Sequence, residues 1–131
     1  MQTQSILARP DDKLLIRWSY GLQQQHRSGA PDIAFSNVLA IPSSFFPYNN
    51  NLTGIHLQKD DKSILLGSFT SVHSVPRSRI ARLNSDGTVD LSFARGIGFS
   101  VDATGAVFAE QTDGKLIVSG SFTNDTGHIR R

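Results

Sequence analysis

An internal repeat is the feature that most constrains the fold of this chain of 131 residues. The stretch "QKDDKSILLGSFT" (58–70) returns 53 residues later as "QTDGKLIVSGSFT" (111–123), with eight of thirteen positions identical. A weaker copy, "RPDDKLLIRWSYG" (9–21), precedes the first by 49 residues. A period of about 50 residues is typical of repeat architectures, in which each period forms one supersecondary unit.

The middle copy predicts a unit of short antiparallel strands. Its apolar runs, such as "SILLG" (63–67), are too short for helices and are bounded by turn residues. Hairpin turns are expected at 60–61, 85–87 and 113–114, because Asp and Gly accept the backbone conformations that such turns require. The segment "SVHSVP" (71–76) is expected to be a loop that Pro76 closes.

Two further strands are expected after that loop. The alternating stretch "RSRIARLN" (77–84) predicts a strand with Arg79 and Arg82 on opposite faces. The stretch "TVDLSF" predicts a fourth strand, with Val89, Leu91 and Phe93 on one face. A four-stranded antiparallel sheet repeated every 50 residues is the blade of a β-propeller.

The N-terminal copy departs from this pattern in its second half. "GLQQQHRSGA" (21–30) replaces the third strand or obscures it, whereas "PDIAF" (31–35) aligns with "VDLSF" (89–93). Segment 36–51 has no counterpart in the other copies. Its aromatic residues Phe45, Phe46 and Tyr48 predict a functional or interfacial loop, because long loops rich in aromatic residues within compact domains usually take part in function or in an interface.

The predicted fold is therefore all-β, with about two and a half four-stranded antiparallel units arranged as a partial β-propeller or an open β-sandwich. The whole chain, 1–131, forms a single repeat domain, with units at about 4–35, 52–96 and 103–131. Expected core residues are Ile64, Leu66, Phe69, Ile80, Leu83, Phe93, Ile117 and Phe122.

Composition narrows the classes of function. The net charge of +2 comes without a clustered basic face, which disfavours nucleic-acid binding, and no apolar run is long enough to span a membrane. The chain has no cysteine, so thiol chemistry and disulfides are excluded. The stretch "MQTQSILARPDD" lacks the basic and apolar regions of a signal peptide, so none is expected.

The stretches "QTDGKLIVSGSFT" and "PRSRIARLNSDGTVDLSF" resemble the delta-60 repeat family. The matching positions include Gln111, Asp113, Gly114, Lys115 and, in the second stretch, the run 80–84. The resemblance is specific over 57–93 and 106–122, weak over 6–35 and absent over 36–50. It implies a β-propeller of the kind found in large bacterial surface or secreted proteins and in some phage structural proteins. It brings no catalytic residues with it.

No constellation of side chains predicts a reaction, so we expect a non-enzymatic protein without a cofactor or metal. The turn "NSDGTVD" offers Asn84, Asp86 and Asp90 as oxygen ligands, but Asp-Gly is also common hairpin chemistry, and the turn interpretation is favoured. Candidate ligand or interface residues are Trp18, Tyr20, Phe45, Phe46, Tyr48, Arg79 and Arg82. For Trp18 and Tyr20 packing between units is the favoured interpretation, and for the arginines ion pairs or hydrogen bonds to turn carboxylates.

Two functions from different classes follow. The first is a structural or interaction protein, with a phage virion component (tail, fibre or capsid-associated) preferred over a bacterial surface protein. The second is a carbohydrate-binding, lectin-like oligomer or a fragment of a surface adhesin. Two and a half blades do not close a propeller, so we expect protein partners, oligomerisation or a larger assembly.

Overall fold

The computed structural model describes residues 3–18, 21–35, 52–69, 71–77, 79–93 and 107–119, and all statements below concern these residues. They form ten strands and one helical turn at 33–35. The strands are β1 (Thr3–Ala8), β2 (Leu14–Trp18), β3 (Gly21–Gln25), β4 (Leu52–Leu57), β5 (Ser63–Gly67), β6 (Ser71–Val72), β7 (Val75–Pro76), β8 (Ile80–Leu83), β9 (Val107–Glu110) and β10 (Leu116–Ser119).

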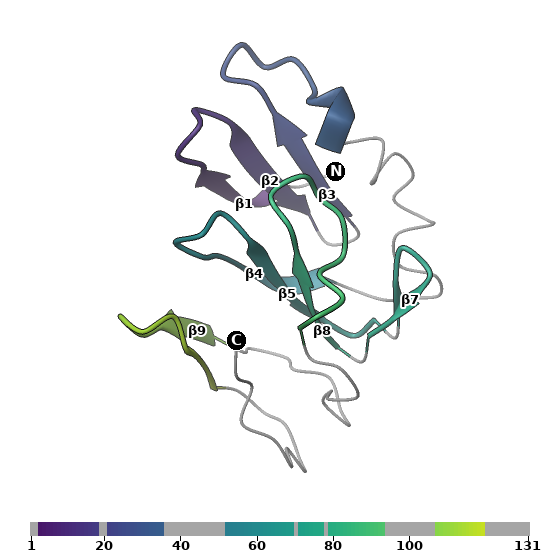
Figure 1. Cartoon of the computed structure of the whole chain (residues 1–131). Coiled ribbons are helices and arrows are strands. Elements are labelled where there is room, and N and C mark those ends of the chain that lie inside the picture. The colour runs from purple at the N-terminus through teal and green to yellow at the C-terminus, as the bar shows by residue number, and fades with distance from the viewer. Residues whose placement is uncertain are drawn as a thin grey trace.

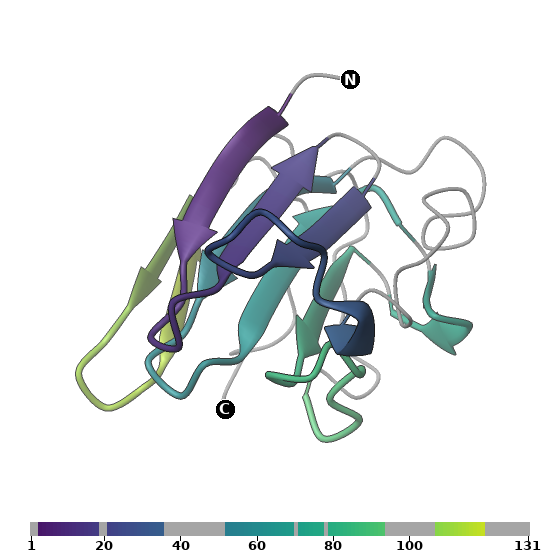
Figure 2. The same cartoon turned by 90° about the horizontal axis from the view of Figure 1, so that it is seen from above.

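The strands build four antiparallel sheets, of which three form the repeat units in chain order and the fourth is the small hairpin β6-β7. Unit 1 is the sheet β1-β2-β3, unit 2 is β4-β5-β8, and unit 3 is the pair β9-β10. Figure 1 shows these sheets stacked, with unit 2 between the other two, and Figure 2 shows the same stack from above, where the sheets overlap. The expected all-β fold of propeller-like antiparallel units is confirmed. Within the described part of the chain no helix is long and apolar enough to cross a membrane.

The same five-residue turn joins the first two strands of every unit. In each copy the first residue bonds the fifth across the hairpin mouth, as in Arg9 N to Lys13 O at 2.8 Å and Gln58 N to Lys62 O at 2.8 Å. The fourth residue has a positive φ, 63° at Asp12, 67° at Asp61 and 78° at Gly114. Asp and Gly tolerate this left-handed conformation. The predicted hairpins at 60–61 and 113–114 are confirmed.

A second repeated turn follows the third strand. Asn84 N bonds Thr88 O at 2.8 Å in unit 2, and His26 N bonds Ala30 O at 2.8 Å in unit 1. The positive-φ residue is Gly87 in one and Gly29 in the other. The hairpin at 85–87 is therefore confirmed. Unit 1 departs less from the pattern than its sequence indicates, because β3 is a full third strand paired with β2 along five residues.

In units 1 and 2 the fourth strand is reduced to a single bridge, Gln25 with Pro31 and Leu83 with Val89. The expected fourth strand at Val89, Leu91 and Phe93 is therefore wrong. The carboxylate of Asp90 accepts a hydrogen bond from the Ser92 amide at 2.9 Å, which turns the chain out of the ladder. Leu91 consequently lies 57% exposed, while Phe93 is buried.

The loop 71–76 and the start of the third strand of unit 2 also differ from expectation. The loop 71–76 contains the short hairpin β6-β7, in which Pro76 pairs with Ser71. Arg79 does not belong to the strand that carries Arg82, because its φ of 65° is left-handed and β8 begins only at Ile80. Its backbone still bonds Phe69 and Gly67, so it forms an irregular step before the strand.

The core lies between units 1 and 2. Leu15 and Leu22 of unit 1 pack with a cluster that includes Leu65 and Leu83 of unit 2. The opposite face of unit 2 buries Ile64, Leu66 and Ile80. All the expected core residues among the described ones are buried except Ile117, which is 50% exposed, and Phe122 lies outside the described residues.

Ile117 is exposed because of the face on which it lies. It pairs with Ala109, whereas the neighbouring pair, Leu116 and Glu110, lies on the face turned towards unit 2. Successive residues of a strand point to opposite faces, so Ile117 points away from unit 2. Its counterpart Ile64 points in the same direction, pairs with His56 on the face of unit 2 turned towards Glu110 of unit 3, and is buried.

Candidate functional site

Unit 1 holds a cluster of charged and polar side chains at the end of its sheet, which we call carboxylate cluster 1: Arg9, Lys13, Gln24, Asp32 and Phe35. The Asp32 Oδ2 atom lies 2.9 Å from Lys13 Nζ and accepts a hydrogen bond from Gln24 Nε2 at 2.7 Å. Gln24 Oε1 in turn accepts from Arg9 Nη1 at 2.7 Å. Arg9 lies over the Phe35 ring, 5.9 Å from its centroid.

Unit 2 builds the same cluster with two positions exchanged. Carboxylate cluster 2 comprises Gln58, Lys62, Arg82, Asp90 and Phe93. The Asp90 Oδ2 atom lies 2.9 Å from Lys62 Nζ and 2.9 Å from Arg82 Nη2. Arg82 lies over the Phe93 ring at 4.6 Å from its centroid. Arginine and glutamine have therefore changed places: the turn carries Arg9 in unit 1 but Gln58 in unit 2, and the third strand carries Gln24 but Arg82.

These contacts hold both carboxylates ionised. Hydrogen bonds from Lys13 and Gln24 lower the pKa of Asp32 to about 2. Burial opposes ionisation of Asp90, but hydrogen bonds from Ser92 and Lys62 and the charge of Arg82 outweigh it, so the pKa of Asp90 lies well below its ordinary value. The hydrogen bond to Asp32 raises the pKa of Lys13. Each carboxylate thus remains an anion within its cluster at neutral pH.

The exchange changes what lies between neighbouring units. At the junction of units 1 and 2 the Arg9 guanidinium reaches across and donates to the Asp61 carbonyl oxygen at 2.9 Å, and it pairs with Asp61 Oδ2 at 2.7 Å. Arg17 Nη1 also crosses the junction, donating to the Leu52 carbonyl oxygen at 2.6 Å. Arginine side chains therefore fill and join this junction.

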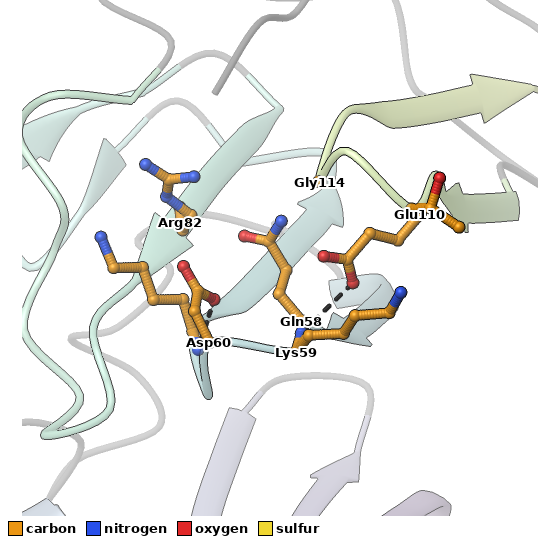
Figure 3. Close-up of a pocket in the computed structure, with 8 residues that line it drawn as sticks. Gln58, Lys59, Asp60, Arg82, Glu110 and Gly114 are labelled. Carbon is orange, nitrogen blue, oxygen red and sulfur yellow. Dashed lines mark hydrogen bonds between the residues drawn. The ribbon is translucent and has the colours of Figure 1, made fainter.

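At the junction of units 2 and 3 the shorter Gln58 occupies the position of Arg9, and a polar pocket of about 370 Å³ lies there. The residues that line it include Gln58, Lys59, Asp60, Arg82, Glu110 and Gly114. In Figure 3 the Gln58 amide points into the pocket between Arg82 on one side and Glu110 on the other. This pocket is the candidate functional site.

Glu110, in β9 of unit 3, lines the pocket and contacts two residues of unit 2. Its Oε2 atom lies 3.3 Å from His56 Nε2 and accepts a hydrogen bond from the Lys59 amide at 3.3 Å, which Figure 3 marks. The corresponding residues are Ala8 in unit 1 and Leu57 in unit 2, so this carboxylate is particular to unit 3. The pocket therefore gains an anionic group that the first junction lacks.

Of the two sequence-predicted candidates whose side chains the structure describes, Arg79 and Arg82, Arg82 lines this pocket and pairs with Asp90. Arg79 is half-buried immediately before β8. Trp18 lies in β2 opposite Gly21, and its side chain lies outside the described part of the structure. Tyr20, Phe45, Phe46 and Tyr48 also lie outside the described residues.

Sequence reasoning missed Gln58 and Glu110 as site residues. The signal was the position that reads Arg9, Gln58 and Gln111 in the three turns, together with the opposite change from Gln24 to Arg82. That second change can be seen only when "GLQQQ" is recognised as a third strand.

The comparison with known families agrees with the repeat architecture. The family described as "Domain of unknown function (DUF5122) beta-propeller" matches residues 58–93 and 111–131. The chain matches no curated protein and no solved structure. The matched family supports propeller-type repeats, and with them a repeat-based structural or interaction role.

Proposed function

We propose that this chain is a non-enzymatic structural or interaction protein whose repeat units assemble head to tail with units of further copies. The observation that carries the proposal is the exposure of one apolar sheet face at each end of the stack. Ile6 of unit 1 is 57% exposed and Ile117 of unit 3 is 50% exposed.

The two exposed faces are the two halves of one kind of junction. Ile6 pairs with Ile16 in unit 1, as Ile55 pairs with Leu65 in unit 2, and that pair packs against the core shared with unit 1. Unit 1 thus exposes at one end the face that unit 2 buries against it. Ile117 corresponds to Leu15 and Ile64, which both face the following unit and are buried.

A second copy of this chain is therefore the occupant that fits. Its unit 1 would present Ile6 and Ile16 to Ile117, repeating the contact that units 1 and 2 already make. Head-to-tail contacts close into a ring when the rotation per unit fits, and closure removes exposed edges. A ring of a few copies would reach the usual four to eight blades of a propeller.

Two single variants test this arrangement, because each disrupts one of the two sheet faces that would meet at the junction between copies. We expect Ile6→Asp and Ile117→Asp each to stop large assemblies, since a buried unpaired carboxylate is costly. An equimolar mixture should form a heterodimer, because each variant retains the face that the other has lost. Size-exclusion chromatography with light scattering checks the masses. A mixture that stays monomeric while the unmodified chain assembles would show that these faces do not meet.

The setting of such an assembly is proposed on the resemblance to delta-60 repeats alone. We propose a phage virion component first, with a bacterial surface adhesin or a lectin-like oligomer as alternatives. A glycan array separates the lectin from the scaffold: reproducible binding to one class of glycan would favour the lectin, and no signal would favour the scaffold.

A further inference from the structure

The Gln58 side chain at the junction of units 2 and 3 carries a buried amide oxygen that lacks a hydrogen-bond donor among the described residues. Gln58 is 6% exposed, and its Oε1 atom is buried without a hydrogen-bond partner among the described residues. An unsatisfied buried acceptor destabilises a protein, so an acceptor of this kind in the wall of an open pocket marks the place of a missing donor. Figure 3 shows the Gln58 amide directed into the pocket.

The neighbouring junction shows which donor this position takes. There the Arg9 guanidinium occupies the equivalent space, donating to the amide oxygen of Gln24 and to the carbonyl oxygen of Asp61. At the second junction Gln58 stands in the position of Arg9, Arg82 in that of Gln24 and Gly114 in that of Asp61, and all three line the pocket. The turn therefore offers the Gln58 amide where the first junction offers the Arg9 guanidinium, and the guanidinium of the second junction lies on the third strand, at Arg82.

Arg82 does not supply the missing donor to Gln58. Its Nε and Nη2 atoms both bind Asp90 Oδ2 at 2.9 Å, and its guanidinium lies over the Phe93 ring. Asp90 thereby compensates much of the charge of Arg82. Glu110 on the opposite wall adds a carboxylate that can pair with a cation.

We propose that this pocket is a binding site for a guanidinium group supplied from outside the chain. The ligand donates to Gln58 Oε1 and to the Gly114 carbonyl oxygen, and it pairs with the Glu110 carboxylate, as Arg9 does with its own partners at the first junction. A planar guanidinium suits this set because it carries five donors in a fixed plane. Two sources share this chemistry: an arginine side chain of a partner protein and a small free guanidinium compound.

The test uses the full chain and three probes, compared two at a time, in NMR titrations that follow the Gln58 side-chain amide and the Gly114 amide. The first pair is N-acetyl-L-arginine amide and its uncharged analogue N-acetyl-L-citrulline amide. We expect the arginine probe to bind with a dissociation constant on the order of 1 mM, as for a small polar ligand, and citrulline to bind at least tenfold more weakly. Methylguanidinium is then compared with the arginine probe: equal binding indicates a small-molecule source, and weaker binding indicates a side chain.

Three variants locate the site. Gln58→Arg should fill the pocket as Arg9 does, weakening arginine binding at least tenfold while raising Tm. Glu110→Gln keeps the side-chain shape and should weaken binding at least tenfold. Gln111→Arg makes the same exchange at the exposed turn of unit 3 and should leave binding unchanged. Equal binding of citrulline, unchanged binding by Gln58→Arg, or no binding at 20 mM (about twentyfold above the expected constant) would overturn the proposal. The site lies within one chain, so these results do not depend on head-to-tail assembly.

Discussion

The buried carboxylates Asp32 and Asp90 show how single residues hold each unit together. Each carboxylate receives a lysine from the first turn and a donor from the third strand, and each also caps the turn that follows it, Asp32 towards Ala34 and Asp90 towards Ser92. One aspartate thus links three segments that are distant within the unit. The geometry is kept although arginine and glutamine have exchanged places around it.

Asp90→Asn should be strongly destabilising. The substitution leaves Arg82, whose side chain is 7% exposed, without a charged partner. Removing one member of a buried ion pair costs about 3–5 kcal/mol, because the other charge stays buried. Urea unfolding measures the loss. Asp86→Asn, at an exposed turn, is the control and should cost under about 1 kcal/mol. Similar losses of unfolding free energy in both variants would mean that the ion pairs of Asp90 stabilise the fold no more than an exposed turn carboxylate does.

Acid should weaken the fold between about pH 4 and pH 2. Asp32 has its pKa lowered from 3.8 to about 2, so its stabilisation is present above pH 4 and is lost as pH falls towards 2. Lys13 is 30% exposed, so solvent screening leaves about 1 kcal/mol for this contribution. Asp32→Asn should therefore be less stable than the parent at pH 6, and most of this difference should be lost by pH 2. A constant difference across that range would contradict the assignment.

At the scale of elements, the turns that follow the third strands of units 1 and 2 have the same backbone conformation but different neighbours. Gly29 and Gly87 occupy equivalent positions with φ of 88° and 89°, but a Cβ on Gly29 would meet nothing within 4 Å. A Cβ on Gly87 would lie 3.1 Å from the Phe35 ring of unit 1. The turn of unit 2 is therefore also a packing surface of the junction.

The pair of variants Gly29→Ala and Gly87→Ala separates backbone strain from packing. Gly29→Ala should cost about 1 kcal/mol, the usual penalty for an L-residue in left-handed backbone. Gly87→Ala should cost a further 1–3 kcal/mol or so, because the methyl group meets the Phe35 ring. Thermal unfolding of both variants measures the difference. Equal losses would show that the junction adapts to the methyl group without cost.

The sequence predicted the elements better than the site. Strands and turns followed from short apolar runs and Asp-Gly chemistry, which are local signals. The prediction of a fourth strand was wrong because the hydrogen bond from the Ser92 amide to Asp90 competes with the hydrogen bonds of the sheet. The alternation of apolar and polar residues in "VDLSF" does not reveal this competition. The pocket was beyond reach because it arises between units, from one side chain being shorter than its counterpart. Periodicity places Gln58 on a turn but does not reveal what faces it.

At the scale of the whole molecule, the three units repeat one junction with different contents. The first is closed by Arg9 and Arg17, and the second holds the polar pocket. The outer faces at Ile6 and Ile117 match the halves of that same junction. A stack of this kind can be extended at either end by an identical unit, which is why assembly rather than a reaction is the proposed activity.

Sedimentation velocity of the unmodified chain, from about 1 to 100 μM, tests this account most directly. A head-to-tail stack should give one dominant closed species whose mass is an integer multiple of 14.3 kDa and which gains population with concentration. Closure predicts that this species stops growing. A single 14.3 kDa monomer over the whole range, unfolding cooperatively on heating, would contradict the proposed assembly.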